Sequence, residues 1–370
     1  MQTTLDDSFV LLGQGRVSLQ SYLAEANLDQ IRCSSEVWHI NESSQKLSYL
    51  THNFFRFFGK FPPPVAERFI KQLHNPTCGL ILDPMMGSGT TLVEALRLKR
   101  PSIGIDINPL FRTVAKAKTT FIEPEKVHKR LKDLSKFRNI DEKEYVGYIP
   151  RDRHLDHWFF HETQQQLAAI RYYIESQPRI NQNDENIYVF LNVGLSAIIR
   201  QVSRASKRMG RMFFDPGITP VDAFKAFERR IHQMIKKLPQ LKELTPKPNI
   251  LENAEARETG LKNDSIGLVI CHPPYFNLYR YSSVYRFELL WLGYNPKEIR
   301  KYEVREGFKQ GKADKVDLYV SDMLKVLSEA HRVLTPNCYC VLMIGDATIK
   351  DERVPTTALL LDSLPPHDFQ

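Results

Sequence analysis

Apolar segments alternate with polar turns in the first third of the chain. The proline-led segment PVAERFIKQL, which begins at Pro64, predicts a helix, and residues 79–83 predict a short buried strand. Residues 90–98 then predict a second helix and residues 102–106 a second strand. Because strands and helices alternate and the first loop carries glycines, the pattern is typical of an α/β fold with a doubly wound parallel sheet.

Between residues 110 and 245 the strand pattern is absent, and amphipathic helical segments follow one another. These predicted helices are 124–137, 157–176, 185–200 and 220–237. The α/β pattern then returns, with predicted strands at 249–251, 266–271 and 339–345 and a long helix at 316–334. We therefore expect four parts: an N-terminal arm or cap (1–50), the first half of the α/β domain with the cofactor site (51–120), a large helical insertion (121–245), and the second half of the α/β domain with the catalytic turn (246–370).

Composition narrows the class of protein. With 42% hydrophobic and 25% charged residues the chain is typical of a globular protein rather than a disordered or fibrous one. It has no long apolar run, and Asp6 and Asp7 stand where a signal peptide would be basic and apolar, so we expect a cytoplasmic protein without a membrane partner. The five cysteines are scattered without a zinc-type pair. A net charge of +8 favours a polyanionic partner but is equally compatible with solubility alone.

The loop after the first predicted strand indicates a nucleoside-containing cofactor. In LILDPMMGSGTT, Asp83 ends the strand, and Gly87 and Gly89 permit the close backbone approach that a bound ligand needs. Asp106 ends the next strand, where an acid accepts hydrogen bonds from ribose hydroxyls. No lysine follows Gly89 and the G-x-G-x-x-G pattern is absent, so ATP and NAD are disfavoured. The alternative is a glycine turn that serves only to reverse the chain.

A second motif, His272-Pro273-Pro274-Tyr275, follows the apolar strand at 266–271. Two prolines cannot continue a central strand, so the chain must leave the sheet at its carboxyl end, where such folds bind ligands. Tyr275 suits stacking against a base that has been extruded from a duplex. The alternatives are a loop brace and a proline-rich segment that another domain binds.

DPMMGSGTT resembles the D-P-F-x-G-S-G-T-T motif of the amino-group DNA methyltransferases, with Met85 where that family usually has an aromatic residue. The resemblance implies a Rossmann-like methyltransferase fold and S-adenosylmethionine as cofactor. It also implies a ribose-binding role for Asp106, a K-F pair beside the cofactor in HNFFRFFGKFPP, and an adenine-contacting acid at Glu255. The cofactor-binding residues implied in this way are Lys60, Phe61, Asp83, Pro84, Gly87, Ser88, Gly89, Thr90, Asp106 and Glu255.

The HPPY turn resembles the family's [D/N/S]-P-P-[Y/F] motif, which implies that His272, Pro273, Pro274 and Tyr275 are catalytic. His272 departs from the usual Asp, Asn or Ser. A neutral imidazole can accept a hydrogen bond from the target amine, whereas an imidazolium cannot, so activity should fall as His272 protonates. The surrounding ICHPPYFNLYRY favours cytosine N4 slightly over adenine N6 as the target.

Basic residues suggest where DNA is contacted. Five cations fall within twelve residues, and a continuing helix would carry most of them on one face; they are Arg200, Arg204, Lys207, Arg208 and Arg211. A solvated helix face is the alternative. A second candidate follows the HPPY turn, where aromatic rings and guanidinium groups alternate in a composition that suits an unstacked base; the residues are Tyr279, Arg280, Tyr281, Tyr285 and Arg286. Packing of some of these tyrosines in the core is the alternative. His154, His157 and His161 lack a carboxylate or cysteine that would complete a metal site, so no metal is predicted.

Together the motifs predict an enzyme that methylates the exocyclic amino group of a base flipped out of double-stranded DNA, in restriction-modification or phage defence. An RNA methyltransferase and a non-catalytic DNA-binding subunit with a degenerate site are the alternatives, and a homodimer or a partner subunit is left open.

The chain stops at Gln370, before the closing β-hairpin usual in this family, so we expect either a fragment or another segment that completes the sheet. The prediction requires that the loop after Asp83 and the turn at His272 open side by side onto one crevice.

Overall fold

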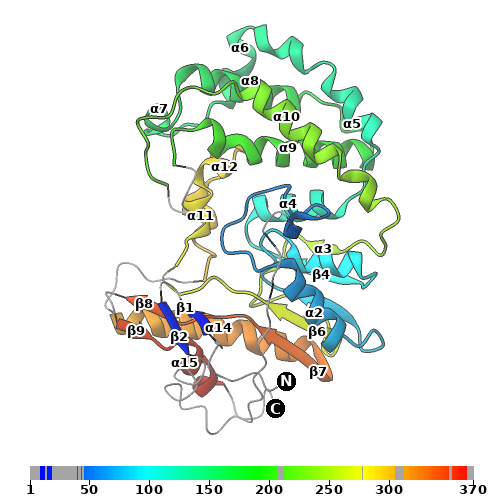
Figure 1. The fold of residues 1–370 in the computed structure, drawn as a ribbon, viewed down its shortest axis with the longest axis vertical. Helices are drawn as coiled ribbons and strands as arrows, with labels where there is room; N and C mark the ends of the chain where they lie inside the picture. The colour runs from blue at the N-terminus through cyan, green and yellow to red at the C-terminus, as the bar shows by residue number, and fades with distance from the viewer. Residues whose placement is uncertain are drawn as a thin grey trace.

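A computed structural model describes residues 9–12, 15–18, 40, 43, 46–206, 212–276, 278–304, 312–349 and 352–364. Most of the expected N-terminal arm lies outside these ranges. Figure 1 shows a parallel sheet with its covering helices at one end of the molecule and a group of helices at the other.

The central sheet has five parallel strands in the order β5-β4-β3-β6-β7. The strands are β3 (Leu80–Asp83), β4 (Ser102–Ile105), β5 (Asn249–Leu251), β6 (Ile266–Cys271) and β7 (Leu334–Leu342). From β3 the chain first builds outward through β4 and β5, and then returns to add β6 on the other side of β3. The strand order therefore reverses between β3 and β6, and in open α/β sheets this switch point is where ligands bind. The α/β fold class predicted from the sequence is confirmed.

Side chains that alternate along β3 and β6 face two different layers of helices. Ile81, Leu268 and Ile270 pack in one apolar cluster with α2 and α3, whereas Leu82 and Val269 pack in another cluster with α14. Alternation of this kind follows from the two-residue period of a strand, and it buries both faces of the sheet. The covering helices are α2 (Pro63–Leu73), α3 (Thr90–Arg97), α4 (Pro109–Thr119), α14 (Lys312–Val333) and α15 (Thr356–Ser363).

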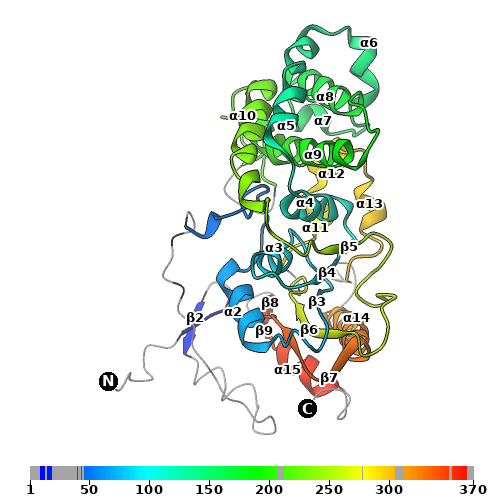
Figure 2. The ribbon, with the colours of Figure 1, turned by 90° about the vertical axis from the view of Figure 1, so that its right-hand side faces the viewer.

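The helices between β4 and β5 form a second apolar core with α4 (Figures 1 and 2). They are α5 (Pro124–Leu131), η4 (Leu134–Asn139), α6 (Glu142–Tyr145), η5 (Val146–Tyr148), α7 (Leu155–Trp158), α8 (His161–Glu175), α9 (Gln182–Val202), α10 (Ala223–Ile235) and η6 (Leu238–Leu241). Three short helices that follow the HPPY turn also belong to this end of the molecule: α11 (Tyr281–Val284), α12 (Arg286–Trp291) and α13 (Pro296–Ile299). Phe287 and Trp291 of α12 are buried in the same core.

Several helix boundaries differ from those predicted. The single helix expected over 157–176 is broken, because Phe159 and Phe160 adopt extended backbone between α7 and α8. The helix expected from residue 124 ends at Leu131 and continues as the 3-10 turns of η4. Helix α4 was not predicted, although the side chain of Asn108 caps its N-terminus by accepting a hydrogen bond from the amide of Leu110.

Two small hairpins lie outside the main sheet. Strands β1 (Phe9–Leu12) and β2 (Gly15–Ser18) pair antiparallel, as do β8 (Ala347–Ile349) and β9 (Glu352–Val354), and a 3-10 turn, η3 (Lys46–Ser48), precedes the ordered segment at His52. None of the helices in the described part of the chain combines the length and apolar character that crossing a bilayer requires.

Candidate active site

A cleft opens at the switch point, between the loops that follow β3, β4 and β6. Its empty space is about 940 Å³, counting the part open to solvent, and it is lined from both the glycine loop and the HPPY turn. The two segments therefore meet at one crevice, as the sequence analysis required. The predicted residues that line the cleft are Lys60, Phe61, Asp83, Pro84, Gly87, Ser88, Thr90, Asp106, Glu255, His272 and Pro274. Gly89, Pro273 and Tyr275 are not among the lining residues.

The glycine loop has a backbone that only glycine adopts easily. Gly87 and Gly89 have φ angles of 49° and 75°, and Gly89 is the N-cap of α3. A Cβ atom on Gly87 would lie 2.8 Å from the ring of Phe57, so a side chain there would also clash. The hydroxyls of Ser88 and Thr90 are buried and have no hydrogen-bond partner among the described residues. The loop therefore presents unsatisfied polar groups to the cleft.

Two carboxyl groups lie at the base of the cleft. Asp106 accepts hydrogen bonds from the backbone amides of Gly87 (2.9 Å) and Asn108 (2.8 Å), and its carboxylate thus joins the two loops. Burial raises the pKa of Asp106 to about 6, although these amide bonds act in the opposite direction. Asp83 accepts a hydrogen bond from the amide of Met85 (3.2 Å), and burial, with a smaller effect from Asp106, raises the pKa of Asp83 to about 7.

In the HPPY turn, His272 is held by two aromatic side chains. Its Nε2 lies 3.1 Å from the hydroxyl of Tyr275, and its ring meets that of Phe61 edge-on with centroids 5.3 Å apart. Burial lowers the pKa of His272 to about 4, so the imidazole is neutral near pH 7. The carbonyl of Pro274 accepts a hydrogen bond from the hydroxyl of Tyr319 on α14 (3.0 Å), which fixes the turn to the helix layer.

Tyr275, unlike His272 and Pro274, does not line the cleft. Its ring lies beside Gly345, where a Cβ atom would be 3.5 Å from the ring. Its hydroxyl faces His272. The structure does not place the ring of Tyr275 where a base would stack on it, since the residue does not line the cleft. The stacking role therefore stays a prediction.

Aromatic residues form one wall of the cleft; Tyr279 and Tyr281 were singled out in the sequence analysis, whereas Phe57 and Phe111 were not. The ring of Phe57 stacks on Tyr281 with centroids 5.2 Å apart, and Phe111 packs edge-on against both rings. Tyr279 also lines the cleft, whereas Tyr285 is buried in the helical core. The run of phenylalanines in HNFFRFFGK was a signal for such packing, but no pattern showed which ring faces the cleft.

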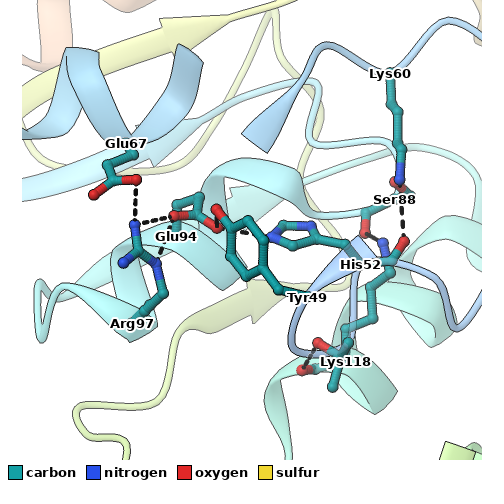
Figure 3. Close-up of polar contacts among 9 residues, drawn as sticks. Tyr49, His52, Lys60, Glu67, Ser88, Glu94, Arg97 and Lys118 are labelled. Atoms are coloured by element: carbon teal, nitrogen blue, oxygen red, sulfur yellow. Dashed lines mark hydrogen bonds and ion pairs between the residues drawn. The ribbon is translucent and has the colours of Figure 1, made fainter. Parts of the chain in front are cut away.

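Upstream of the glycine loop, a buried polar network ties residues 49–60 to α3 (Figure 3). The carboxylate of Glu94 is fully buried and contacts His52 Nε2 (2.7 Å), the hydroxyl of Tyr49 (2.7 Å) and the guanidinium of Arg97 (2.8 Å). Burial lowers the pKa of His52 to about 4, so a neutral imidazole donates its Nε2 proton to Glu94. The carbonyl of His52 in turn accepts a hydrogen bond from Lys60 Nζ (3.1 Å). The network therefore orients a lysine that lines the cleft.

A second lysine, Lys118, is hydrogen-bonded to the backbone of the glycine loop. Lys118, at the end of α4, is fully buried and donates a hydrogen bond from Nζ to the carbonyl of Ser88 (2.8 Å) (Figure 3). Burial holds the pKa of Lys118 well below its usual range. Sequence reasoning missed Glu94, His52 and Lys118, since single polar residues within apolar segments carry no motif.

Glu255, which follows β5, also lines the cleft. Arg257 donates two hydrogen bonds of 2.9 Å to its carboxylate, and the same guanidinium lies 3.6 Å from Asp322. The adenine-contacting role predicted for Glu255 stays a prediction.

The predicted row of DNA-contacting cations requires a correction. Helix α9 ends at Val202, and Ser203 is extended, so Arg200 and Arg204 do not share the face of one continuous helix as expected. Arg200 is buried, donates to the carbonyl of Val284 (3.0 Å), and lies over the ring of Phe58. It therefore stabilises the core instead of contacting phosphate.

The structure does not test the other predicted DNA contacts, which stay predictions. Arg204 lies between the rings of Phe160 and Phe214, at 4.9 and 4.5 Å from their centroids. Arg280 is half-buried at the start of α11. Lys207, Arg208 and Arg211 lie outside the described residues.

Comparisons with known proteins agree with this geometry. A family model described as DNA methylase, for the N6 and N4 methyltransferases, matches residues 18–117. The chain is 24% identical to the type II methyltransferase M.MvaI of Kocuria varians, and the match covers 87% of this chain and 84% of that protein. It is also 24% identical to M.BsoBI of Geobacillus stearothermophilus, over 68% of this chain and 54% of that protein. A shorter match, 40% identical, joins 22% of the chain to 16% of M.MjaII of Methanocaldococcus jannaschii.

The strand order and the cleft at its switch point define an α/β protein with a cleft at the carboxyl edge of its sheet, where folds of this kind bind ligands. The family model places a DNA methylase domain of the N6 and N4 type within residues 18–117, and over most of its length the chain is similar to type II DNA methyltransferases. An enzyme of this family requires a methyl donor.

Proposed function

We propose that the chain transfers a methyl group from S-adenosylmethionine to the exocyclic amine of cytosine (N4) or adenine (N6) in double-stranded DNA. Of these two targets, the sequence around the HPPY turn slightly favours cytosine. The observation that carries the proposal is the shared cleft, in which the glycine loop and His272 face one another across the switch point. The type II names of the relatives support a role in restriction-modification.

The residues of the cleft fit S-adenosylmethionine. Asp106 offers carboxylate oxygens at the end of β4, where ribose hydroxyls are bound in folds of this kind. The hydroxyls of Ser88 and Thr90 are buried without partners among the described residues, which suits a polar ligand. Lys60, held by the carbonyl of His52, would meet the cofactor's carboxylate. When bound, S-adenosylmethionine supplies an electrophilic methyl group on a sulfonium sulfur.

The HPPY turn would then orient the target amine. The neutral imidazole of His272 can accept a hydrogen bond from the amine, and the carbonyl of Pro273 would accept a second. Two acceptors direct the nitrogen lone pair along the line of transfer, so the acceleration comes from positioning rather than from a covalent nucleophile. The base must leave the duplex to reach the turn.

The proposal is tested by mass-spectrometric analysis of nucleosides from cells that express the protein. We expect N4-methylcytosine or N6-methyladenine in DNA, absent from cells that carry the empty vector. Methylated amino bases confined to RNA would instead favour the RNA enzyme. Unmodified nucleic acid, together with no cofactor binding in calorimetry, would favour a non-catalytic subunit and contradict the proposal.

The pH dependence of the reaction should separate cofactor binding from catalysis. At saturating cofactor and DNA, kcat should stay level down to about pH 5.5 and fall only near pH 4, because His272 remains a neutral acceptor above its lowered pKa. Cofactor affinity should weaken earlier, below about pH 6, as Asp106 protonates and loses acceptor capacity.

The matched control for this profile is His272→Asn, which keeps a hydrogen-bond acceptor but does not titrate. Its kcat should not show the fall that protonation of the imidazole causes. Circular dichroism at each pH confirms that the chain is folded. A wild-type kcat that falls with a midpoint near 6.5 in folded protein would contradict the assignment of His272.

A further inference from the structure

A second concave surface, here called the basic groove, lies next to the cleft. It is formed by residues 48–60 and by one face each of α9 and α10. Figure 2 shows α10 running down toward the η3 segment. Arg230 joins the two walls, because its guanidinium donates to the carbonyls of Asn53 and Phe54, the latter at 2.6 Å.

The groove is rich in positive charge. Its basic side chains are Arg56, Lys60, Arg229 and Arg230, and no aspartate or glutamate is among the described residues that line it. On α10, Ala226, Arg229, Arg230 and Gln233 follow the spacing that places helical residues on one face. A neighbouring surface hollow beside α4 differs, since its three basic residues are accompanied by Glu185 and Glu252.

The groove also offers neutral hydrogen-bond donors. Asn53, Gln201 and Gln233 line it, and Asn53, Arg56, Arg229 and Gln233 are exposed. Guanidinium, ammonium and amide groups together are the donors that commonly bind phosphate oxygens of DNA.

The basic groove and the cleft share two lining residues, Phe57 and Lys60. A nucleotide whose base enters the cleft stays attached to its neighbours by the sugar-phosphate backbone. The groove on the other side of residues 57–60 is therefore close enough to receive the phosphates that flank that nucleotide.

We propose that the basic groove binds the backbone phosphates of the DNA strand whose base enters the cleft, with Arg56 and Arg229 as its accessible phosphate contacts. The inference rests on the proposed function. It places a DNA contact at the face of α10 and the segment before the glycine loop, which the sequence analysis did not predict. Arg230 closes the groove by holding the backbone of residues 53 and 54.

The test compares two charge-neutralising variants of α10. Arg229→Gln removes a groove cation, and Lys236→Gln removes an exposed cation just beyond the last turn of the same helix and outside the groove. Binding to a fluorescein-labelled duplex of mixed sequence is followed by anisotropy over a range of salt concentrations. Each phosphate contact contributes about 0.9 to the slope of log K against log salt.

For Arg229→Gln we expect the slope to decrease in magnitude by about 0.9 and the Kd at near-physiological salt to rise about fivefold. The double variant Arg56→Gln/Arg229→Gln should lose about twice as much slope. Lys236→Gln should match wild type in slope, in cofactor Kd and in kcat at saturating DNA.

An unchanged slope in both Arg229→Gln and the double variant, with a wild-type enzyme that methylates DNA, would overturn the groove assignment alone. An equal loss of slope in Lys236→Gln would overturn it too, because the effect would then be one of net charge. A wild-type protein that neither binds nor methylates DNA would overturn the proposed function itself.

Discussion

Replacing His272 with alanine is expected to lower kcat for DNA methylation by about 100-fold, equivalent to roughly 2.7 kcal/mol of transition-state stabilisation. The physical reason is the loss of a preorganised acceptor at the point where the target amine must be oriented. His272 is neutral because burial lowers its pKa, and Tyr275 and Phe61 hold its ring. Single-turnover methylation of duplex DNA with labelled cofactor measures the effect.

Two variants separate the contributions within the turn. His272→Asn keeps an acceptor oxygen and should retain activity within about tenfold of wild type. Tyr275→Phe keeps the ring but removes the hydroxyl that lies 3.1 Å from Nε2, and should lose about tenfold at most. Tyr275→Ala, which also removes the ring, should abolish methylation if that ring receives the base. Wild-type rates in both His272→Ala and Tyr275→Ala would exclude the turn as the catalytic centre.

Replacing Glu94 with alanine is expected to lower the free energy of unfolding by about 3 kcal/mol, because it leaves the buried partners of a fully buried carboxylate without their acceptor. His52, Tyr49 and Arg97 all contact that carboxylate. Urea unfolding followed by circular dichroism measures the change. Because the network also orients Lys60, the affinity for cofactor should fall in the same variant.

The matched control is Glu67→Ala. Glu67 pairs with the same Arg97 at 2.6 Å, but its side chain is 25% exposed, and a pair of that kind contributes less than about 1 kcal/mol. Equal destabilisation by the two substitutions would show that the buried network is not what holds residues 49–60 on α3.

Four strands of the sheet could be predicted from the sequence because each is a short apolar run that ends at a polar or proline-rich turn. The fifth, expected at 339–345, lies at Leu334–Leu342, because its first half is polar and carries no strand pattern. Predicted and observed bounds of β3, β4, β5 and β6 agree within one residue. The cleft could be predicted for the same reason, since the carboxyl ends of adjacent parallel strands meet at one edge.

What could not be predicted depends on partners distant in sequence. The charge pattern around Arg200 indicated an exposed face, but Phe58 and the carbonyl of Val284 supply buried partners for that guanidinium. Sequence reasoning also gave no sign that the ring of Tyr275 lies beside Gly345, which follows another strand. The sequence pattern shows which side chains are polar, but the contacts of each side chain depend on residues that only the folded structure brings together.

The composition of the helical core limits which segments can be exchanged between relatives. That core contains residues from the inserted helices, from Phe54 and Phe55 before the glycine loop, and from α12 after the HPPY turn. Transplanting residues 121–245 from a relative would therefore separate the inserted helices from the partners against which they pack in the donor protein. A chimera would need to carry the phenylalanine segment and α12 with the inserted helices, because all three pack in one core.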